Sequence, residues 1–372
     1  MKIIFTGGHF SPAYALIERL KQKNSILVVG RKYAFEGNIS ESYEYKVCQK
    51  FEIPFKELET GRLQRSFTKH TIPSLMRTVK GFSDSVKILK EEKPDVVVTF
   101  GGYISLPVAL AAYFLKIPIA LHDQTLKPGL SAKIVSKFAD CNMVSFESSK
   151  KYFPKERTII TGNPIRSDIL KGGSTLSIPD HLPIIYVTGG SSGSHILNKA
   201  IEGILGELVK NYIVIHQSGD NKELGDFQVL KEKREELPEE YRKNYILKKF
   251  YLPAEVGDIL KKTSIIISRA GINTVTELIA TGTVGLLVPL LFGKLTEQKE
   301  NAVFFKERGL GEYIEQEELT PELMLSKIQS MMENYTQYTD NRSAALKYVT
   351  LDAADKIIEQ IEKLYGRRRK EG

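Results

Sequence analysis

Three glycine-rich turns are the segments whose residue types and spacing most plainly suggest a chemical role. They comprise Thr6-Gly7-Gly8-His9, Phe100-Gly101-Gly102-Tyr103 and Thr188-Gly189-Gly190-Ser191-Ser192-Gly193, and each follows a short apolar run. Glycine allows backbone N–H groups to approach a phosphate at the N-terminus of a helix, where the helix dipole favours an anion. The turns therefore predict a phosphorylated ligand. None contains GxGxxG with a well-placed acidic partner or GxxxxGK[ST], so neither a dinucleotide fingerprint nor a P-loop is expected.

A second polar cluster follows a run of isoleucines at residues 265–267, where a buried strand is expected to enter a helix. The stretch from Gly271 to Thr274 offers open backbone N–H groups and a hydroxyl at the helix N-terminus. Glu277 lies about one turn further on, where a carboxylate can accept hydrogen bonds from both hydroxyls of a ribose. This pattern suits a nucleoside diphosphate. A carboxylate there can also act only as a partner of the helix dipole, and the segment alone does not separate the two interpretations.

Metal chemistry and a bound cofactor are not expected. The six histidines are dispersed, and no two aspartates occur as Asp-x-Asp, the usual Mg²⁺ or Mn²⁺ clamp on a nucleotide diphosphate. A pyrophosphate would then be held by helix N-termini, hydroxyls and arginine. Cys48 and Cys141 have no ligand-like spacing and are expected to be ordinary reduced thiols.

The elements that position these residues follow from an alternation of Ile- and Val-rich runs with longer amphipathic stretches, which predicts β-α-β units and parallel sheets. The first series ends near residues 157–161, and a second begins at 183–187 after a glycine-containing loop. We therefore predict an α/β protein with two doubly wound, Rossmann-like domains in tandem. A final amphipathic helix at residues 351–362 leads into the basic tail Gly366-Arg367-Arg368-Arg369-Lys370.

Charge is distributed unevenly between the two halves. Residues 1–163 contain 25 Lys and Arg against 15 Asp and Glu, a net charge of +10, whereas the remainder has 28 against 30, a net charge of −2. The first half is therefore expected to meet an anionic partner, such as a phospholipid surface or a pyrophosphate. Nucleic acid is not expected, because no nucleic-acid module accompanies the scattered basic residues. No apolar run approaches the roughly 18 to 20 residues that span a bilayer, and no signal-peptide layout opens the chain, so we expect a cytoplasmic protein.

An ordered set of motifs resembles a known family. The second half contains SRAGxxTxxEL from Ser268, QxxNA from Gln298 and the GGSxG turn, preceded by TGNPIR from Thr161. The first half contains TGGHFSPA at 6–13, GGYISLPVALAA at 101–112, and His122-Asp123-Gln124-Thr125. These resemble the MurG-type N-acetylglucosaminyltransferases of peptidoglycan synthesis, in glycosyltransferase family 28, over about residues 1 to 310. The resemblance implies a GT-B fold, with two Rossmann-like domains and a cleft between them.

The same resemblance implies the reaction. It is an inverting, metal-independent transfer of N-acetylglucosamine from UDP-N-acetylglucosamine to a lipid-pyrophosphate-linked muramoyl pentapeptide, lipid I to lipid II, by a peripheral protein on the cytoplasmic face of the cell membrane. Residues 1–163 would form the acceptor- and membrane-facing domain, 164–182 the hinge, and 183–340 the UDP-sugar-binding domain. Residues 341–372 would return the chain toward the first domain.

Residue roles carried over from the family are as follows. The substrate-binding residues are Thr6, Gly7, Gly8, Thr125, Arg166, Ser191, Phe250, Tyr251, Arg269, Gly271, Ile272, Asn273, Thr274, Val275, Thr276, Glu277 and Gln298, and the acceptor-side residues are Gly101, Gly102, Tyr103 and Asp123. Phe250 and Tyr251 would frame the uracil. His9 is the candidate to help deprotonate the acceptor hydroxyl, although a capping or phosphate-contacting imidazole remains an alternative. The chain departs from the family pattern at Ile4-Phe5, at Asp123 and Thr125, and at Leu295.

Two other functions stay open at this point. A UDP-N-acetylglucosamine 2-epimerase has the same architecture and donor, although it would not need a basic, membrane-facing first domain. A noncatalytic protein that binds sugar nucleotides or anchors a partner transferase is the other alternative.

A possible membrane contact lies between residues 70 and 90. Leu75, Met76, Val79 and Phe82 recur there at helical spacing beside Arg77 and Lys80. Large apolar residues next to cations suit contact with anionic lipid. A helix that faces the core with a solvated basic edge would give the same pattern.

Overall fold

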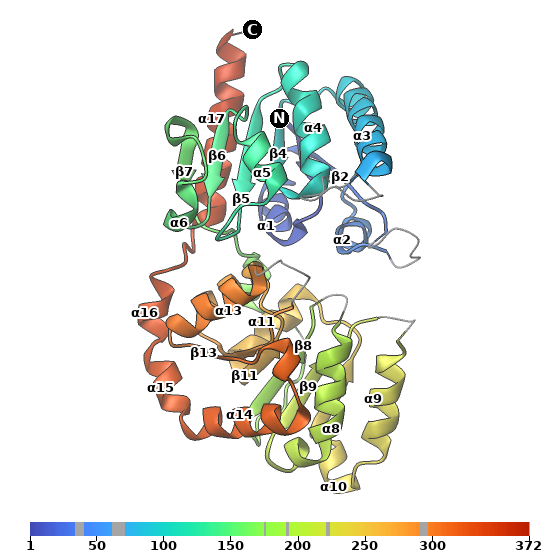
Figure 1. The fold of residues 1–372 in the computed structure, drawn as a ribbon, viewed down its shortest axis with the longest axis vertical. Coiled ribbons are helices and arrows are strands. Elements are labelled where there is room, and N and C mark those ends of the chain that lie inside the picture. Colours follow the sequence, from blue (N-terminus) through green and yellow to red (C-terminus); the bar gives the residue numbers. More distant parts are fainter. Residues whose placement is uncertain are drawn as a thin grey trace. The chain divides into compact units, whose positions relative to one another are not determined.

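The computed structural model describes residues 1–33, 41–61, 71–174, 176–190, 193–220, 224–290 and 297–371, with the backbone alone described at 71–75 and 368–371. The chain forms two compact α/β units (Figure 1). The first contains residues 1–166 and 350–372, and the second contains residues 167–349. The prediction of two doubly wound domains is confirmed.

The first unit is built on a seven-stranded parallel sheet in the order β3-β2-β1-β4-β5-β6-β7. Its strands are β1 (Lys2–Thr6), β2 (Ser25–Gly30), β3 (Phe55–Glu57), β4 (Val96–Thr99), β5 (Ile119–Asp123), β6 (Cys141–Val144) and β7 (Thr158–Ile160). Its helices are α1 (Phe10–Leu20), α2 (Tyr43–Lys50), α3 (Thr71–Glu92), α4 (Gly102–Phe114), α5 (Leu130–Val135), α6 (Glu147–Lys150) and α17 (Ala353–Glu371), with a 3₁₀ turn at Lys155–Arg157. The strand order reverses between β1 and β4.

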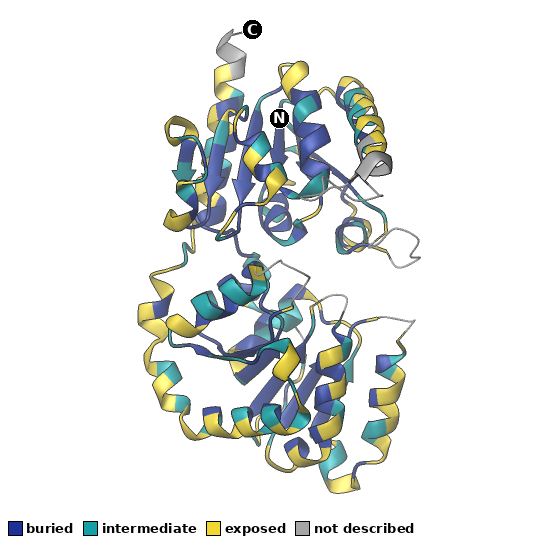
Figure 2. Cartoon of the chain, in the orientation of Figure 1, coloured by how far each residue is buried: buried dark blue, intermediate teal, exposed yellow. Residues whose placement is uncertain are grey.

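Both faces of this sheet are covered, which explains why its strands are apolar at nearly every position. In β1, Ile3 and Phe5 belong to the hydrophobic cluster that includes α1, whereas Ile4 belongs to the cluster on the opposite face. This alternation is the period of two that a strand imposes on its side chains. Figure 2 shows the strands buried and the outer sides of the helices exposed.

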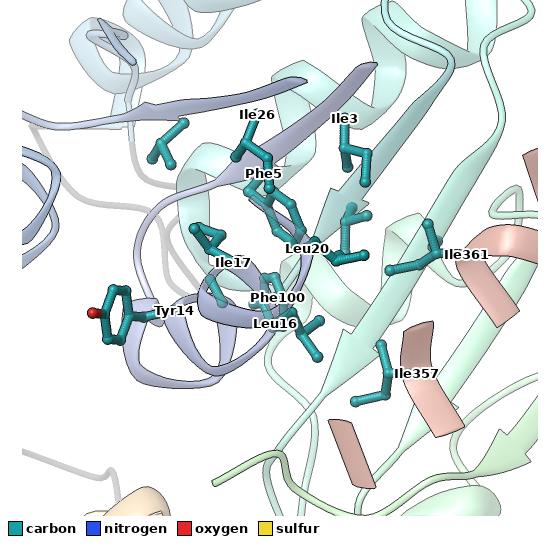
Figure 3. Close-up of a cluster of buried hydrophobic side chains, with 14 of the residues drawn as sticks. Ile3, Phe5, Tyr14, Leu16, Ile17, Leu20, Ile26, Phe100, Ile357 and Ile361 are labelled. Carbon is teal, nitrogen blue, oxygen red and sulfur yellow. The ribbon is translucent and has the colours of Figure 1, made fainter. Parts of the chain in front are cut away.

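The C-terminal helix α17 completes the core of the first unit. Ile357 and Ile361 are fully buried in the cluster that contains Ile3 and Leu16, and Figure 3 shows them pointing toward α1. Gly162 lies against the point where the chain re-enters this unit, since a Cβ on Gly162 would come within 2.4 Å of the Thr350 Cβ. An amphipathic helix from the end of the chain therefore covers a sheet built from its beginning.

The second unit has a six-stranded parallel sheet in the order β10-β9-β8-β11-β12-β13. Its strands are β8 (Ile184–Thr188), β9 (Ile213–Gln217), β10 (Tyr245–Lys248), β11 (Thr263–Ser268), β12 (Val284–Leu287) and β13 (Gly311–Tyr313). Its helices are α7 (Ser167–Lys171), α8 (His195–Asn211), α9 (Asp226–Glu235), α10 (Glu239–Arg242), α11 (Pro253–Lys262), α12 (Ile272–Thr281), α13 (Glu297–Glu307), α14 (Pro321–Glu333), α15 (Tyr335–Asp340) and α16 (Arg342–Leu346), with a 3₁₀ turn at Gln316–Glu318. Here the order reverses between β8 and β11.

Residues 167–174 are attached to the second unit. The Asp258 carboxylate of α11 accepts hydrogen bonds from the Gly173 N–H at 2.9 Å and from the Ser174 N–H and hydroxyl, both at 2.6 Å. Gly257 allows α7 to approach closely, since a Cβ there would come within 2.3 Å of the Asp168 carbonyl oxygen. This part of the segment between the two series of strands is therefore held to α11 as an integral piece of the second unit.

In open α/β sheets, ligands bind outside the carboxyl ends of the strands where the strand order reverses. The structure has two such positions, one beyond β1 and β4 and one beyond β8 and β11. The three glycine turns lie at these ends. Among the helices that the structure describes, none combines the length and the apolar character that crossing a membrane requires.

Candidate active site

The first two glycine turns meet at the carboxyl ends of β1 and β4. A Cβ on Gly8 would lie 3.9 Å from the Gly101 carbonyl oxygen, and a Cβ on Gly102 would lie 3.7 Å from Nδ1 of His9. Gly8, Gly101 and Gly102 all have positive φ, at 105°, 72° and 77°, a conformation that side chains disfavour. Residues 93 positions apart in the sequence thus lie next to each other.

The amides of the first turn already have partners. Gly7 donates its N–H to the Val29 carbonyl at 2.7 Å, and the Gly8 N–H bonds the Glu44 carboxylate. Glu44 is buried and also accepts the Arg31 N–H at 3.4 Å. Burial raises the pKa of Glu44, and these hydrogen bonds act in the opposite direction. A carboxylate of the protein therefore occupies the position near the first turn where the sequence suggests a phosphate.

The second turn is differently equipped. Gly101 is the N-cap of α4 and supplies no side-chain cap, so the first N–H groups of the helix can face a ligand. The Arg31 guanidinium, at the carboxyl end of β2, lies 4.9 Å from the centre of the Tyr103 ring. The α4 N-terminus and a cation stacked on Tyr103 together favour an anion here.

His9 precedes α1, and its side chain makes no capping hydrogen bond to that helix. Burial lowers the pKa of His9, and a hydrogen bond with the Phe100 backbone acts in the opposite direction. The imidazole is therefore neutral near pH 7 and able to accept a proton. Because the His9 side chain makes no capping hydrogen bond, the interpretation of His9 as a helix cap is excluded.

Asp123 ends β5 beside the second glycine turn, where its Oδ2 would lie 3.9 Å from a Cβ on Gly101. Its Oδ1 accepts hydrogen bonds from the Thr125 N–H at 2.9 Å and the Thr125 hydroxyl at 2.5 Å. Burial raises the pKa of Asp123 to about 6, against the effect of the Thr125 hydrogen bonds. The Thr125 hydroxyl also lies 2.9 Å from the Lys127 carbonyl oxygen. Thr125 is thus buried and engaged in orienting Asp123.

In the second unit, β11 ends at Ser268 and α12 begins at Ile272, with Gly271 as an N-cap that offers no side-chain cap. Ile272, Val275 and Thr276 are buried, and the Thr276 hydroxyl donates to the Ile272 carbonyl at 2.8 Å. The remaining predicted residues of this helix share its other, partly exposed side: Asn273, Thr274 and Glu277. Glu277 follows Asn273 by four residues and Thr274 by three, which are the spacings of residues on one helical face.

Arg269 and Gln298 flank this helix N-terminus. The Arg269 guanidinium donates to the Val288 carbonyl at 3.2 Å, and burial lowers its pKa to about 10, so it stays charged at neutral pH. The Gln298 side-chain oxygen accepts the Leu290 N–H at 2.9 Å, and the buried Asn301 amide donates to the Ala270 carbonyl at 3.0 Å. These bonds hold the start of α13 beside the turn before α12.

The two residues predicted to frame the uracil differ in their exposure to solvent. Phe250 is 42% exposed, whereas Tyr251 is buried and packs edge-on against Tyr186 at 6.2 Å. Only Phe250 of this pair is therefore open to a base. Arg166 ends the first unit and donates to the Tyr43 hydroxyl at 3.2 Å. Ser191, predicted to bind substrate, and Leu295 lie outside the described residues.

Gln217 is a further candidate site residue, which the sequence analysis did not single out. It ends β9, is only 4% exposed, and donates from its amide to the Thr188 hydroxyl at 3.1 Å and the Gly190 carbonyl at 2.9 Å. Its carbonyl oxygen accepts the Tyr251 N–H at 2.9 Å. The available signal was the polar pair His216-Gln217 directly after the buried run Ile213-Val214-Ile215.

Comparison with known proteins agrees with this geometry. Residues 3–144 match the glycosyltransferase family 28 N-terminal domain, and residues 184–361 match the glycosyltransferase family 28 C-terminal domain. A relative from Clostridium perfringens (strain SM101 / Type A) is 34% identical over 350 residues, covering 91% of this chain and 92% of the relative. The chain belongs to glycosyltransferase family 28. That relative is named UDP-N-acetylglucosamine--N-acetylmuramyl-(pentapeptide) pyrophosphoryl-undecaprenol N-acetylglucosamine transferase, as is one from Treponema denticola, 35% identical over 88% of this chain and 86% of the relative.

Solved structures show that this family 28 protein has the GT-B fold. MurG from Acinetobacter baumannii superimposes with a TM-score of 0.66 at 22% identity, covering 97% of this chain and 99% of that one. A UDP-GlcNAc 2-epimerase from Neisseria meningitidis gives a TM-score of 0.65 at 17% identity, covering 98% and 100%. These similarities concern the fold alone. Within the described part of the chain, no three His, Cys, Asp or Glu side chains gather in a way that could hold a metal ion.

Proposed function

We propose that this protein transfers N-acetylglucosamine from UDP-N-acetylglucosamine to undecaprenyl-pyrophosphoryl-linked muramoyl pentapeptide, lipid I to lipid II, with inversion and without a metal. The observation that carries the proposal is the end-to-end similarity, 34% over 91% of the chain, to a relative named for this reaction. The family motifs also lie at the carboxyl ends of strands where the order of each sheet reverses.

The donor would bind at α12. Its diphosphate would face the uncapped helix N-terminus at Gly271 and the Arg269 cation, which together stabilise the charge that develops on UDP as it leaves. Thr274 and Glu277 lie on the same exposed side of the helix, so Glu277 would hold the ribose hydroxyls. Phe250 would contact the uracil, and Gln298 the sugar. The buried residues Ile272, Val275 and Thr276 would act by fixing the helix.

The acceptor pyrophosphate would face the N-terminus of α4 and the Arg31 guanidinium over Tyr103. His9, neutral near pH 7, would accept the proton of the acceptor hydroxyl. The hydroxyl oxygen would then bond to C1 of the sugar, on the face opposite UDP, as the bond from C1 to the phosphate oxygen breaks. UDP leaves with that electron pair, so the anomeric configuration is inverted.

An exposed apolar surface of the first unit supports the proposal that the protein binds the cytoplasmic face of an anionic membrane. The residues of this surface, the α3/α4 patch, are Met76, Val79, Tyr113 and Phe114. Met76 and Val79 are 70% and 64% exposed, and Phe114 is 67% exposed. Phe82, half-buried, meets the Phe114 ring edge-on at 5.9 Å.

Cations lie beside the α3/α4 patch. Arg77 and Lys80 are exposed on the same helix as Met76 and Val79. Apolar side chains next to cations suit the boundary between anionic headgroups and acyl chains. The high exposure of Met76 and Val79 argues against the alternative that this side of the helix faces the core. The side chain of Leu75, which belonged to the predicted contact, lies outside the described residues.

One reaction mixture tests the enzymatic proposal. Purified protein, UDP-N-acetylglucosamine and a short-chain lipid-pyrophosphate muramoyl peptide are incubated with EDTA, and both released UDP and the glycosylated lipid are measured. Stoichiometric formation of the two products is expected. UDP release that does not depend on the acceptor would instead indicate epimerase-type chemistry, and no turnover with bound donor would indicate a noncatalytic protein.

A further inference from the structure

Gln217 connects two segments of the second unit that are far apart in the sequence. It pairs with Thr188 in the register of the parallel strands β9 and β8, so its side chain starts beside the third glycine turn. Because it is almost fully buried, each of its polar atoms needs a partner inside the protein. Both of its N–H donors are used by the turn, and its carbonyl oxygen accepts from Tyr251.

The amide holds the described first part of the third glycine turn, Thr188 to Gly190, by hydrogen bonds. Gly190 has φ of 82°, and its N–H donates to the Thr188 hydroxyl at 3.0 Å. Gln217 donates to that same hydroxyl and to the Gly190 carbonyl. It therefore fixes the Gly190 carbonyl directly and the Gly190 N–H through Thr188. Gly193 lies directly against the strand end after Gln217, since a Cβ on Gly193 would come within 2.0 Å of the Ser218 carbonyl oxygen.

The other end of Gln217 holds the segment proposed to contact uracil. Its carbonyl oxygen accepts the Tyr251 N–H, and the Tyr251 side chain is anchored between Tyr186 and the Lys248 ammonium, 4.9 Å from its ring centre. With Tyr251 fixed in this way, the neighbouring Phe250 is left exposed. One buried side chain thus joins a turn suited to phosphate and a segment suited to a base.

We propose that Gln217 is a positioning residue that sets the phosphate turn and the base-contacting segment in a fixed relation, so that the site recognises both ends of a nucleoside diphosphate. This inference rests on the proposed UDP-sugar function. It assigns two separable tasks to one amide: the NH₂ group serves the phosphate end of the donor, and the carbonyl oxygen serves the base end.

Gln217→Glu separates these tasks. The ionised carboxylate has nearly the same shape and still accepts the Tyr251 N–H, but it cannot donate, and it repels the Gly190 carbonyl oxygen. Because burial raises the pKa of a carboxyl group, binding is compared at pH 7 and at pH 9, and the loss of UDP affinity should be at least as large at pH 9. Losing buried donors costs about 1 to 3 kcal/mol, which corresponds to UDP binding weakened about fivefold to 150-fold. Uridine, which has no phosphate, should bind Gln217→Glu and the wild type equally. Gln217→Met removes both functions and should weaken UDP and uridine together.

Dissociation constants of UDP and uridine are measured by ligand-observed NMR, and circular dichroism in the same buffer checks that each variant is folded, because an unfolded fraction weakens the apparent affinity for both ligands by the same factor. Gln337→Glu, an exposed change in the same unit, is the control for added negative charge. Equal losses of UDP and uridine affinity in Gln217→Glu, or no loss of either, overturn the inference. A wild-type protein that binds no UDP overturns the donor-site proposal itself, so the two failures are distinguishable.

Discussion

Asp123 makes the stability of the first unit depend on pH in a way that can be worked out from the structure. Burial raises its pKa from 3.8 to about 6. Between these values the folded state binds more protons at Asp123 than the unfolded state, so the free energy of unfolding falls as pH rises through that window. A difference of about two pKa units corresponds to a destabilisation of the folded state by about 3 kcal/mol. This destabilisation is complete above pH 6 and absent below about pH 4.

Asp123→Asn removes this titration and keeps an oxygen that can accept the Thr125 hydrogen bonds. Relative to wild type, the variant should gain about 3 kcal/mol between pH 4 and pH 7. Any constant effect of the amide on packing is the same at both pH values and cancels in this difference. Urea titrations followed by circular dichroism supply the free energies, and hydrogen exchange in β5 assigns the transition to the first unit.

Glu147→Gln is the matched control, because Glu147 is an exposed carboxyl of the same unit. Its effect on stability should be the same at pH 4 and pH 7. If Asp123→Asn also differs from wild type by the same amount at both pH values, the burial of Asp123 does not control its ionisation and the reasoning is refuted.

Three further changes test the proposed site and the membrane surface. Glu277→Ala should weaken UDP binding by about 1.5 to 3 kcal/mol, since a charged acceptor of two ribose hydroxyls is lost, and unchanged affinity by calorimetry would remove this assignment. His9→Ala should lower kcat by roughly a hundredfold or more while UDP affinity stays near wild type, whereas equal losses in both would make His9 a phosphate contact. Replacing Met76 and Val79 together with serine should reduce sedimentation with anionic vesicles while Tm and UDP binding stay nearly constant, because both side chains are exposed. A large drop in Tm would place them in the core, and unchanged sedimentation would move the membrane contact elsewhere.

The local pattern of apolar and polar residues was sufficient to predict the two-domain architecture. Ile- and Val-rich runs alternating with amphipathic stretches predicted two parallel-sheet domains, because a strand buried on both faces must be apolar throughout. The glycine turns were also recognisable, since positive φ at Gly8, Gly101 and Gly102 requires that residue type. Motif order then indicated the family, and the family comparison confirmed it.

The tertiary structure decided which residues of a motif or a helix are exposed and which are buried. In α12, tertiary packing separates the buried Ile272, Val275 and Thr276 from the partly exposed side with Glu277, although the motif contains all four. The same holds for α3, whose apolar spacing fits both a core and a membrane. Its exposed Met76 is distinguished from its half-buried Phe82 because Phe114, thirty-two residues later, packs on Phe82.

Contacts between distant residues had no signal in the sequence. The Glu44 carboxylate fills the space beside Gly7, Arg31 stacks on Tyr103, and Gln217 bonds both Gly190 and Tyr251, each across a different pair of sheet elements. The period of a helix or strand depends on neighbours along the chain, so it can be read locally. The partner of a polar side chain depends instead on which strands become adjacent, and only the folded sheet determines that.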